Sequence, residues 1–308
     1  MKFIKFILIV VCIIAVGLVS LVGCFSWLER IPMVPLDYVD TVKTGGDIEA
    51  KYIKKGSFEI AYFEEKTNDS LKKYEIYYPK ELETTEKKYP VVVFTNGTGV
   101  AGSKYVALFE HLASWGFVVI GNEEPETWNG ISSDKSIGYL LEQNEKSDSR
   151  FYQKIDVDNI GITGHSQGGA GVFNAITECK NASVYKTAVS LSPTHEEQAI
   201  SMKWHYDLTQ INIPLMIVAG TKGDFETQLV IPIEKMIEMY NKIPSDKVMM
   251  RKTGYEHGEM LYVADGYVTA WLMWQLQNDN DAAKAFTGDT PEIMNNKLYQ
   301  DQKIDLPR

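Results

Sequence analysis

One stretch decides the fold of this chain: Asn159-Ile-Gly-Ile-Thr-Gly-His-Ser166-Gln-Gly-Gly-Ala-Gly-Val-Phe-Asn-Ala-Ile-Thr177. Its first part, residues 160–163, is short and apolar, which predicts a buried strand. Its last part predicts a helix, because Val172, Phe173 and Ile176 recur at helical spacing. We therefore expect a strand that turns directly into a helix.

The turn between them carries Gly164, Ser166 and Gly168 in the pattern G-x-S-x-G. This pattern is typical of a sharp strand-to-helix turn that exposes a serine hydroxyl as a nucleophile. The turn forces its central residue into a strained backbone conformation, and flanking residues without a Cβ relieve the crowding. The alternative is an ordinary tight turn that happens to contain a serine. Gly169 and Gly171 predict close packing where the helix crosses the sheet.

Composition limits the class of protein. The chain has 308 residues, of which 44% are hydrophobic and 23% charged, as expected for one large globular domain with an extension. The net charge of −10 argues against a nucleic-acid partner, because phosphates would be repelled. Cys179 is the only cysteine outside the apolar leader, so no disulfide forms within the domain. No cysteine or histidine pair has zinc-site spacing, and we expect no metal.

The N-terminus predicts a targeting segment. Lys2 and Lys5 precede an apolar run over residues 6–28. Residues 21–24, Leu-Val-Gly-Cys, look like the lipobox of bacterial lipoproteins, in which Cys24 is lipidated after cleavage. Alternatively, the run is long enough to stay as an uncleaved membrane anchor. Either way we expect the remaining chain outside the cell, with residues 1–28 as leader or anchor, 29–50 as linker and 51–308 as the domain.

Strand and helix patterns then alternate along the domain. Alternating apolar residues predict antiparallel strands at residues 57–64 and 73–78. A continuous apolar run predicts a buried strand at 90–95. Further strands are predicted at 117–120, 187–191, 213–219 and 247–251. Helices are predicted at 103–115, 133–150, 229–242 and 260–277. This order indicates an α/β fold with a mostly parallel central sheet flanked by helices. No long insertion between Ser192 and Pro214 suggests a cap domain.

A glycine-rich loop at residues 96–102 supports two hypotheses. Gly97, Gly99 and Gly102 spell G-x-G-x-x-G between a strand and a helix, with Glu123 about 20 residues on, as in dinucleotide-binding domains. However, an exported domain meets little NAD, and at least two strands precede this loop. In a hydrolase, the same loop would aim the N–H of Thr98 at the oxyanion of a tetrahedral intermediate. The second donor would be the N–H of Gln167, after the nucleophile.

The acid and the base are expected after later strands. Asp224 follows the strand at residues 213–219, where the third member of a catalytic triad belongs, and Glu226 is the second choice. His257 lies in a glycine-bounded loop after the strand at 247–251. The order Ser166, acid, His257 places all three at the same edge of a parallel sheet.

Two further residues are candidates for substrate contacts. Trp128 lies in a loop and His195 follows a strand at the carboxyl edge of the sheet. Each has an ordinary alternative, namely a tryptophan that packs at the surface and a partly exposed loop histidine.

With these residues in place, the chain resembles the α/β-hydrolase superfamily. Within it, the chain is similar to the branch of dienelactone hydrolases, chlorophyllases, platelet-activating-factor acetylhydrolases and polyester hydrolases. The resemblance spans about residues 52–278 and is carried by five stretches: 91–98, 112–119, 164–169, 214–220 with Asp224, and 254–257. It implies Ser166, Asp224 and His257 as the catalytic set, Thr98 and Gln167 as oxyanion donors, and no cofactor. The chain differs from secreted polyester hydrolases in lacking their disulfides and in carrying His165 where several have tryptophan.

The sequence therefore predicts a serine hydrolase of the carboxylesterase type, held outside the cell by its N-terminus. Its substrate would be a small-molecule or lipid-like ester, cleaved through an acyl-enzyme. Two other classes remain as alternatives at this point: an NAD-dependent oxidoreductase that uses the Gly97, Gly99 and Gly102 loop, and a non-catalytic surface module.

Overall fold

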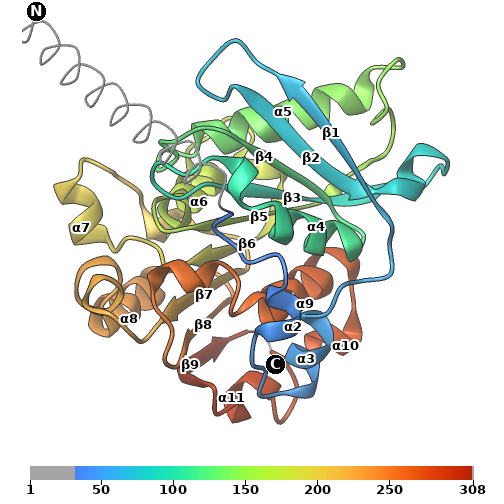
Figure 1. Ribbon diagram of the computed structural model, residues 1–308. Coiled ribbons are helices and arrows are strands. Elements are labelled where there is room, and N and C mark those ends of the chain that lie inside the picture. Colours follow the sequence, from blue (N-terminus) through green and yellow to red (C-terminus); the bar gives the residue numbers. More distant parts are fainter. Residues whose placement is uncertain (1–31, 307–308) are drawn as a thin grey trace, which may run out of the picture. The chain divides into compact units, whose positions relative to one another are not determined.

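A mixed nine-stranded sheet forms the centre of the computed structural model, which describes residues 32–306 (Figure 1). The strand order is β1-β2-β4-β3-β5-β6-β7-β8-β9. The six strands from β4 to β8 in this order pair in parallel, and β1, β2 and β9 pair antiparallel at the two edges. The strands are β1 Ile60–Lys66, β2 Lys73–Pro79, β3 Tyr89–Thr95, β4 Val118–Asn122, β5 Ile155–His165, β6 Tyr185–Leu191, β7 Leu215–Gly220, β8 Lys247–Lys252 and β9 Tyr299–Asp305. The predicted mostly parallel sheet with flanking helices is thus confirmed.

Helices cover both faces of the sheet. The α-helices are α2 Tyr38–Thr41, α3 Asp47–Tyr52, α4 Val106–Ser114, α5 Ile131–Glu145, α6 Gln167–Thr177, α7 Glu196–Ser201, α8 Ile233–Lys242, α9 Asp265–Gln277, α10 Asn280–Ala283 and α11 Glu292–Asn295. The short 3-10 helices are η1 Lys80–Glu83, η2 Gly102–Lys104, η3 Ala182–Val184, η4 Leu208–Gln210 and η6 His257–Leu261, and η5 Phe225–Val230 is a π-helix.

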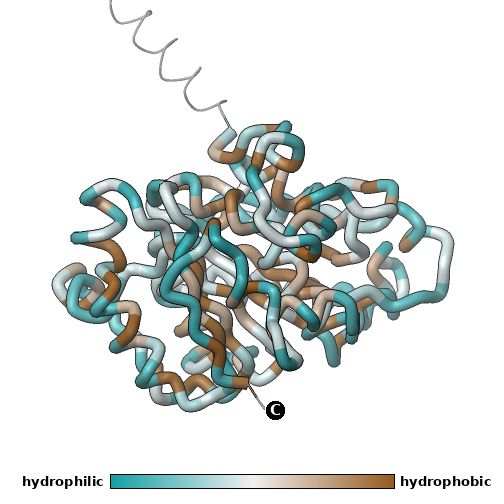
Figure 2. The backbone as a smooth tube through the Cα atoms, turned by 90° about the horizontal axis from the view of Figure 1, so that it is seen from below, coloured by the Kyte–Doolittle hydropathy of each residue, from teal (hydrophilic) through white to brown (hydrophobic). Residues whose placement is uncertain are grey.

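Alternate residues of each buried strand supply two separate cores, as the period of a strand requires. Val92 and Phe94 of β3 pack with residues of α4 and α9 on one face, whereas Val91 and Val93 pack with residues of α5, α6 and α8 on the other. Figure 2 shows the resulting distribution, with apolar stretches along the central strands and hydrophilic ones in many outer loops. The strands are therefore fixed from both sides, and the loops at their carboxyl ends stand on a rigid base.

Two elements differ from those expected from the sequence, the strand β9 and the helix at residues 229–242. The strand β9 was not predicted, because its residues are mostly polar and only partly buried. The helix predicted at residues 229–242 is instead the π-helix η5 followed by α8, which begins after Pro232. Between β6 and β7 the structure has only the short elements α7 and η4, in agreement with the predicted lack of a large cap.

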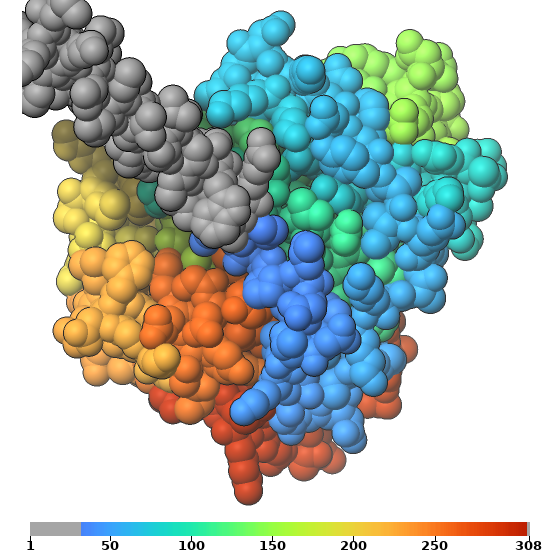
Figure 3. All heavy atoms as spheres, in the orientation of Figure 1, coloured from blue at the N-terminus to red at the C-terminus, as the bar shows by residue number. Residues whose placement is uncertain are grey.

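The segment predicted as a linker, residues 29–50, is folded onto the domain from Val34 onwards. Within the described residues, the compact unit of the domain starts at Val34 and so includes most of this segment. Val34 and Tyr38 are buried, and the hydroxyl of Tyr38 donates to Asp265 at 2.5 Å. Figure 3 shows this blue segment lying beside orange residues from the later part of the chain. Within the segment, α3 contacts α9. The proline and glycine residues that suggested a linker instead shape a path along the surface.

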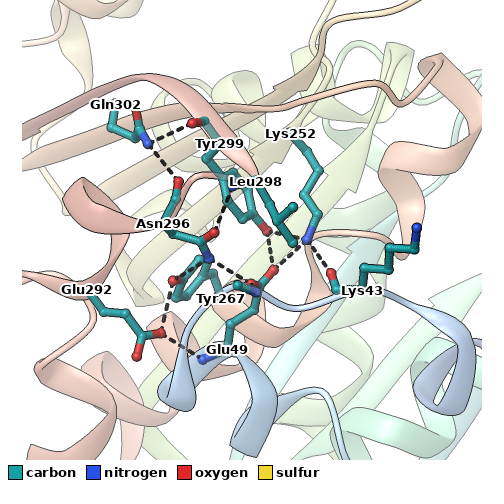
Figure 4. A network of polar contacts seen from close by, with 10 residues as sticks. Lys43, Glu49, Lys252, Tyr267, Glu292, Asn296, Leu298, Tyr299 and Gln302 are labelled. Carbon is teal, nitrogen blue, oxygen red and sulfur yellow. Dashed lines mark hydrogen bonds and ion pairs between the residues drawn. The ribbon is translucent and has the colours of Figure 1, made fainter.

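A buried ion pair fixes the same segment at α3. Lys252 and Glu49 are fully buried, with Nζ 2.5 Å from the carboxylate (Figure 4). The second oxygen of Glu49 accepts from Asn296 at 2.8 Å, and the hydroxyl of Tyr299 also donates to this carboxylate. A buried charge needs such partners, because desolvation otherwise penalises it. The network therefore ties α3 to the end of β8 and to β9.

The predicted leader, residues 1–28, lies outside the described residues. Within residues 32–306, no helix is both long enough and apolar enough to span a bilayer.

Candidate active site

Ser166 lies at the turn between β5 and α6, with the strained backbone that the sequence predicts. Its φ is 60° and its ψ is −120°, a conformation that L-residues rarely adopt. The N–H of Ser166 donates to the carbonyl oxygen of Leu191 at 2.9 Å, which holds the turn against the end of β6. The serine side chain is thus presented at the carboxyl edge of the sheet and at the N-terminus of α6.

The glycines around Ser166 are required by close backbone approaches. A Cβ on Gly168 would lie 2.1 Å from the carbonyl oxygen of Thr95, and one on Gly164 would lie 2.6 Å from that of Gly168. A Cβ on Gly171 would lie 2.2 Å from the carbonyl oxygen of Thr127. These distances are far below van der Waals contact. The G-x-S-x-G pattern and the glycine at 171 therefore reflect packing needs of this turn and helix.

His257 forms a close pair with Glu226. The Nδ1 atom of His257 is 2.6 Å from Oε2 of Glu226. Oε1 of Glu226 accepts two further hydrogen bonds, from the hydroxyl of Ser192 and from the N–H of Gly220, each at 2.6 Å. Burial raises the pKa of Glu226, but the contacts with His257, Ser192 and Gly220 outweigh it and leave the pKa below its usual value. Glu226 is therefore a buried carboxylate that can orient the imidazole.

The acid expected first, Asp224, is not the residue that meets His257. Its side chain is exposed, and its carboxylate accepts from Nε2 of Gln228 at 2.7 Å. The reason is the π-helix η5, which begins at Phe225 and directs Glu226 back towards the end of β7. The second choice, Glu226, is the one that the structure places against His257.

His165 brings the His257 loop next to the serine. The imidazole rings of His165 and His257 lie 4.5 Å apart between centroids, and Nε2 of His165 is 2.8 Å from the carbonyl oxygen of His257. Burial, together with the charge of His257, lowers the pKa of His165 to about 3. His165 is therefore neutral, and its Nε2–H donates to that carbonyl. Because His165 directly precedes Ser166, this bond fixes the loop of His257 beside Ser166.

The predicted oxyanion donors, Thr98 and Gln167, have amide N–H groups that meet no acceptor in the described part of the chain. In the loop after β3, the neighbouring N–H groups are occupied: that of Gly97 binds the hydroxyl of Tyr105 at 3.0 Å, and that of Gly99 binds the carbonyl oxygen of Pro125 at 2.9 Å. The N–H of Gln167 belongs to the first turn of α6, which has no intrahelical partners. Both groups are thus available to an anionic oxygen.

The side chain of Gln167 has a separate role. Its Oε1 accepts from the N–H of Thr127 at 2.9 Å. This bond connects the strand-to-helix turn at Ser166, hereafter the elbow, to the loop that carries Trp128. Trp128 is half-buried, and its carbonyl oxygen accepts from Asn174 of α6 at 2.8 Å. Trp128 therefore lies on a loop held against α6, and its contact with a substrate stays a prediction.

His195 is more buried than a loop histidine was expected to be. It precedes α7, is 7% exposed, and its N–H donates to the carbonyl oxygen of Val230 at 2.9 Å. Burial lowers the pKa of His195, so the ring is neutral. Among the residues described, no hydrogen bond or ring contact joins His195 to Ser166 or His257.

The glycine loop does not have the free acidic residue of a dinucleotide site. The carboxylate of Glu123 accepts from the N–H and the hydroxyl of Ser103, at 2.9 and 3.2 Å. A Cβ on Gly102 would meet the backbone of Asn122 at 2.5 Å, so this glycine serves packing. In residues 32–306 no group of three or more histidine, cysteine, aspartate or glutamate side chains is placed to hold a metal ion.

Comparisons with known proteins place the chain in a family. A family model described as "PETase: PET hydrolase-like" matches residues 43–301. Cutinase est2 of Thermobifida alba is 26% identical over 189 residues, which are 59% of this chain and 56% of the relative. A cutinase of Thermobifida fusca (strain YX) is 26% identical over 215 residues, covering 66% of this chain and 64% of the relative. Chlorophyllase-1, chloroplastic, of Citrus unshiu is 26% identical over 91 residues, 28% of each chain. The chain thus spans little more than half the length of the est2 cutinase.

Proposed function

The chain belongs to the PET hydrolase-like family, whose model matches residues 43–301, and from this premise we propose that it hydrolyses a carboxylic ester through a serine acyl-enzyme. Membership confirms the predicted α/β-hydrolase, polyester-hydrolase-like branch. The family description and the cutinase relatives support the proposed class of carboxylic ester hydrolase. The triad, the substrate and the mechanism below are the proposal.

The proposed nucleophile is Ser166, with His257 as base and Glu226 as acid. As Oγ of Ser166 attacks the carbonyl carbon, Nε2 of His257 takes the hydroxyl proton, and Glu226 stabilises the resulting imidazolium through Nδ1. The imidazolium then gives the proton to the departing alkoxide, so an alcohol leaves and an acyl-enzyme remains. Water, activated by the same imidazole, releases the acid and restores the serine.

The proposed oxyanion donors are the N–H groups of Thr98 and Gln167. The charge that develops on the carbonyl oxygen needs donors that are already oriented, and removal of one such donor typically costs about 3 kcal/mol of barrier. The neighbouring N–H groups of Gly97 and Gly99 already bind Tyr105 and Pro125, which supports Thr98 as the donor there.

One observation carries the proposal. The strained Ser166, with φ of 60°, directly follows His165, and His165 binds the carbonyl oxygen of His257, whose ring in turn is 2.6 Å from Glu226. A structural serine turn would not need a buried carboxylate, an imidazole and an elbow arranged in this order at one sheet edge.

The substrate class that fits is a small or lipid-like ester. Phe225 is 56% exposed and its ring meets that of His257 edge-on, with centroids 5.0 Å apart. An exposed aromatic ring beside the base offers an apolar wall to an acyl or alcohol group. The short connection between β6 and β7 leaves this side without a cap domain.

The direct test uses p-nitrophenyl esters of increasing acyl length with the purified domain and its Ser166→Ala variant. We expect hydrolysis by the wild type and loss of nearly all of it in the variant. His205→Ala, which changes a histidine outside the proposed triad, serves as the control. Equal rates for wild type and Ser166→Ala would refute the proposal.

We also propose that residues 1–28 hold the enzyme at the outer face of the membrane. This rests on the sequence alone: two lysines, an apolar run, and Cys24 in a lipobox-like context. Mass spectrometry of the N-terminus of the native protein distinguishes a lipid on Cys24 from an uncleaved anchor. A free, unlipidated N-terminus beyond residue 28 would overturn both versions.

A further inference from the structure

Ser192 lies directly after β6 in a backbone conformation that costs energy. Its φ is 43°, its side chain is fully buried, and its N–H donates to the carbonyl oxygen of Val218 at 2.7 Å. A residue with a Cβ is disfavoured at positive φ, and glycine would remove that cost. A serine at such a position therefore indicates that its hydroxyl has a role that offsets this cost.

The hydroxyl of Ser192 donates to Oε1 of Glu226 at 2.6 Å. The N–H of Gly220, at the end of β7, donates to the same oxygen at 2.6 Å. Both donors stand at strand ends of the rigid sheet, whereas Glu226 itself is on the π-helix η5. The two donors thus hold one oxygen of the carboxylate and leave Oε2 for Nδ1 of His257.

A glutamate has more need of such a clamp than an aspartate, because it has one more rotatable bond between backbone and carboxylate. The side chain of Glu226 starts on the π-helix η5 and extends back to the sheet. The two hydrogen-bond donors there restrict it to a single rotamer. A carboxylate that is held in advance is also worth more to a developing imidazolium than one that must reorient.

We propose that Ser192 is a positioning residue for the hydrolysis proposed above: its hydroxyl fixes Glu226 so that the second carboxylate oxygen faces His257. The inference rests on the proposed function, since it assigns a role within the same site. Ser192 touches neither the substrate nor the reacting atoms, and it acts through Glu226.

The test compares Ser192→Ala and Ser192→Gly with Ser114→Ala as the matched control. Both variants at 192 remove the hydroxyl, but only glycine also relieves the backbone strain. Ser114 is a buried serine at the end of α4, before the start of β4, and so lies at the opposite end of the parallel strands from Ser192. Its hydroxyl donates to the carbonyl oxygen of His111 and accepts from the N–H of Gly56. Removal of the Ser114 hydroxyl should lower stability without changing the contacts of Glu226.

We expect both variants at 192 to lose about tenfold to a hundredfold in kcat with little change in KM, the range for one hydrogen bond to a buried charge. The pKa of Glu226 rises when a donor is lost, so activity that depends on the ionised carboxylate should begin to fall at a higher pH in both. Ser192→Gly should be the more stable of the two in thermal unfolding, although equally slow. Ser114→Ala should keep the wild-type kcat and pH profile.

A second readout does not depend on turnover. The Nδ1–H proton of His257 should give a low-field NMR resonance in the wild type, and this signal should shift or broaden in both variants at 192 but not in Ser114→Ala. Folded variants at 192 with wild-type kcat, pH profile and NMR signal would refute the role of Ser192 while leaving the proposed function intact. A wild-type domain without esterase activity would instead refute the proposed function.

Discussion

Glu226→Gln, compared with Asp224→Asn, gives the sharpest prediction for the site. Oε1 of Glu226 faces a fixed donor, the N–H of Gly220 at 2.6 Å, and Oε2 faces Nδ1 of His257 at 2.6 Å. A glutamine offers only one acceptor for these two positions. If its oxygen faces Gly220, its amide N–H₂ faces Nδ1, which forces the imidazole into the tautomer that cannot take the serine proton.

The expected loss in kcat for Glu226→Gln follows from these contacts. The reverse orientation keeps the right tautomer but leaves the buried N–H of Gly220 without an acceptor, at a cost of about 1–3 kcal/mol. It also removes the negative charge that stabilises the imidazolium, worth about 4 kcal/mol for charges roughly 4 Å apart at an effective dielectric constant of about 20. Together these terms predict a loss of about 10⁴ to 10⁵ in kcat for Glu226→Gln.

The assay measures kcat and KM on a short p-nitrophenyl ester, with circular dichroism to show that both variants are folded. Asp224 is exposed and bonded only to Gln228 among the described residues, so Asp224→Asn should stay within about twofold of the wild type. A large loss in Asp224→Asn together with near-normal activity in Glu226→Gln would refute the assignment of the acid.

Three further predictions concern stability. Gly168→Ala should lower the free energy of unfolding by about 3 kcal/mol or more, or prevent folding, because the new Cβ would lie 2.1 Å from a backbone oxygen of β3; chemical denaturation of the purified variant measures this. Lys252→Met should cost about 3–5 kcal/mol in the same measurement because it leaves Glu49 buried without its cation, and a Lys252→Met, Glu49→Leu double variant should recover part of the loss. For His111, burial lowers the pKa but the contact with Asp265, 2.7 Å away, outweighs it and raises the pKa, so the stabilisation from this pair should be complete below pH of about 6.5 and fall as pH rises through the folded-state pKa. Melting temperatures of wild type and His111→Gln should therefore converge above neutral pH, and a constant difference across that range would contradict the prediction.

Much of the fold was predictable because the apolar patterns are strong. The buried strands β3, β4 and β7 are largely apolar, and nearly all of their residues are buried. The strand β9 was missed because it lies at an edge and carries Gln300, Asp301 and Gln302, so its pattern does not stand out from a loop. The sequence predicts a linker for the segment from Val34, because its prolines and glycines are typical of linkers. Only a few buried side chains attach this segment to the domain, and they form no apolar pattern.

The site was predictable where the chemistry follows the local sequence. The elbow at Ser166 and the loop of His257 follow from glycines next to strands, and both lie where expected. The identity of the acid could not be settled in this way, because Asp224 and Glu226 are two residues apart and only the path of the π-helix decides between them. The hydrogen bonds of Ser192 and His165 depend on tertiary contacts and have no local signal in the sequence.

The central claim is that Ser166 is a nucleophile activated by His257. The most direct measurement is treatment of the folded domain with a fluorophosphonate, followed by peptide mass spectrometry to locate the adduct. We expect a single stoichiometric adduct on Ser166 that forms far more slowly in His257→Ala. An unlabelled wild-type protein, or an adduct on another residue with Ser166 unmodified, would contradict it.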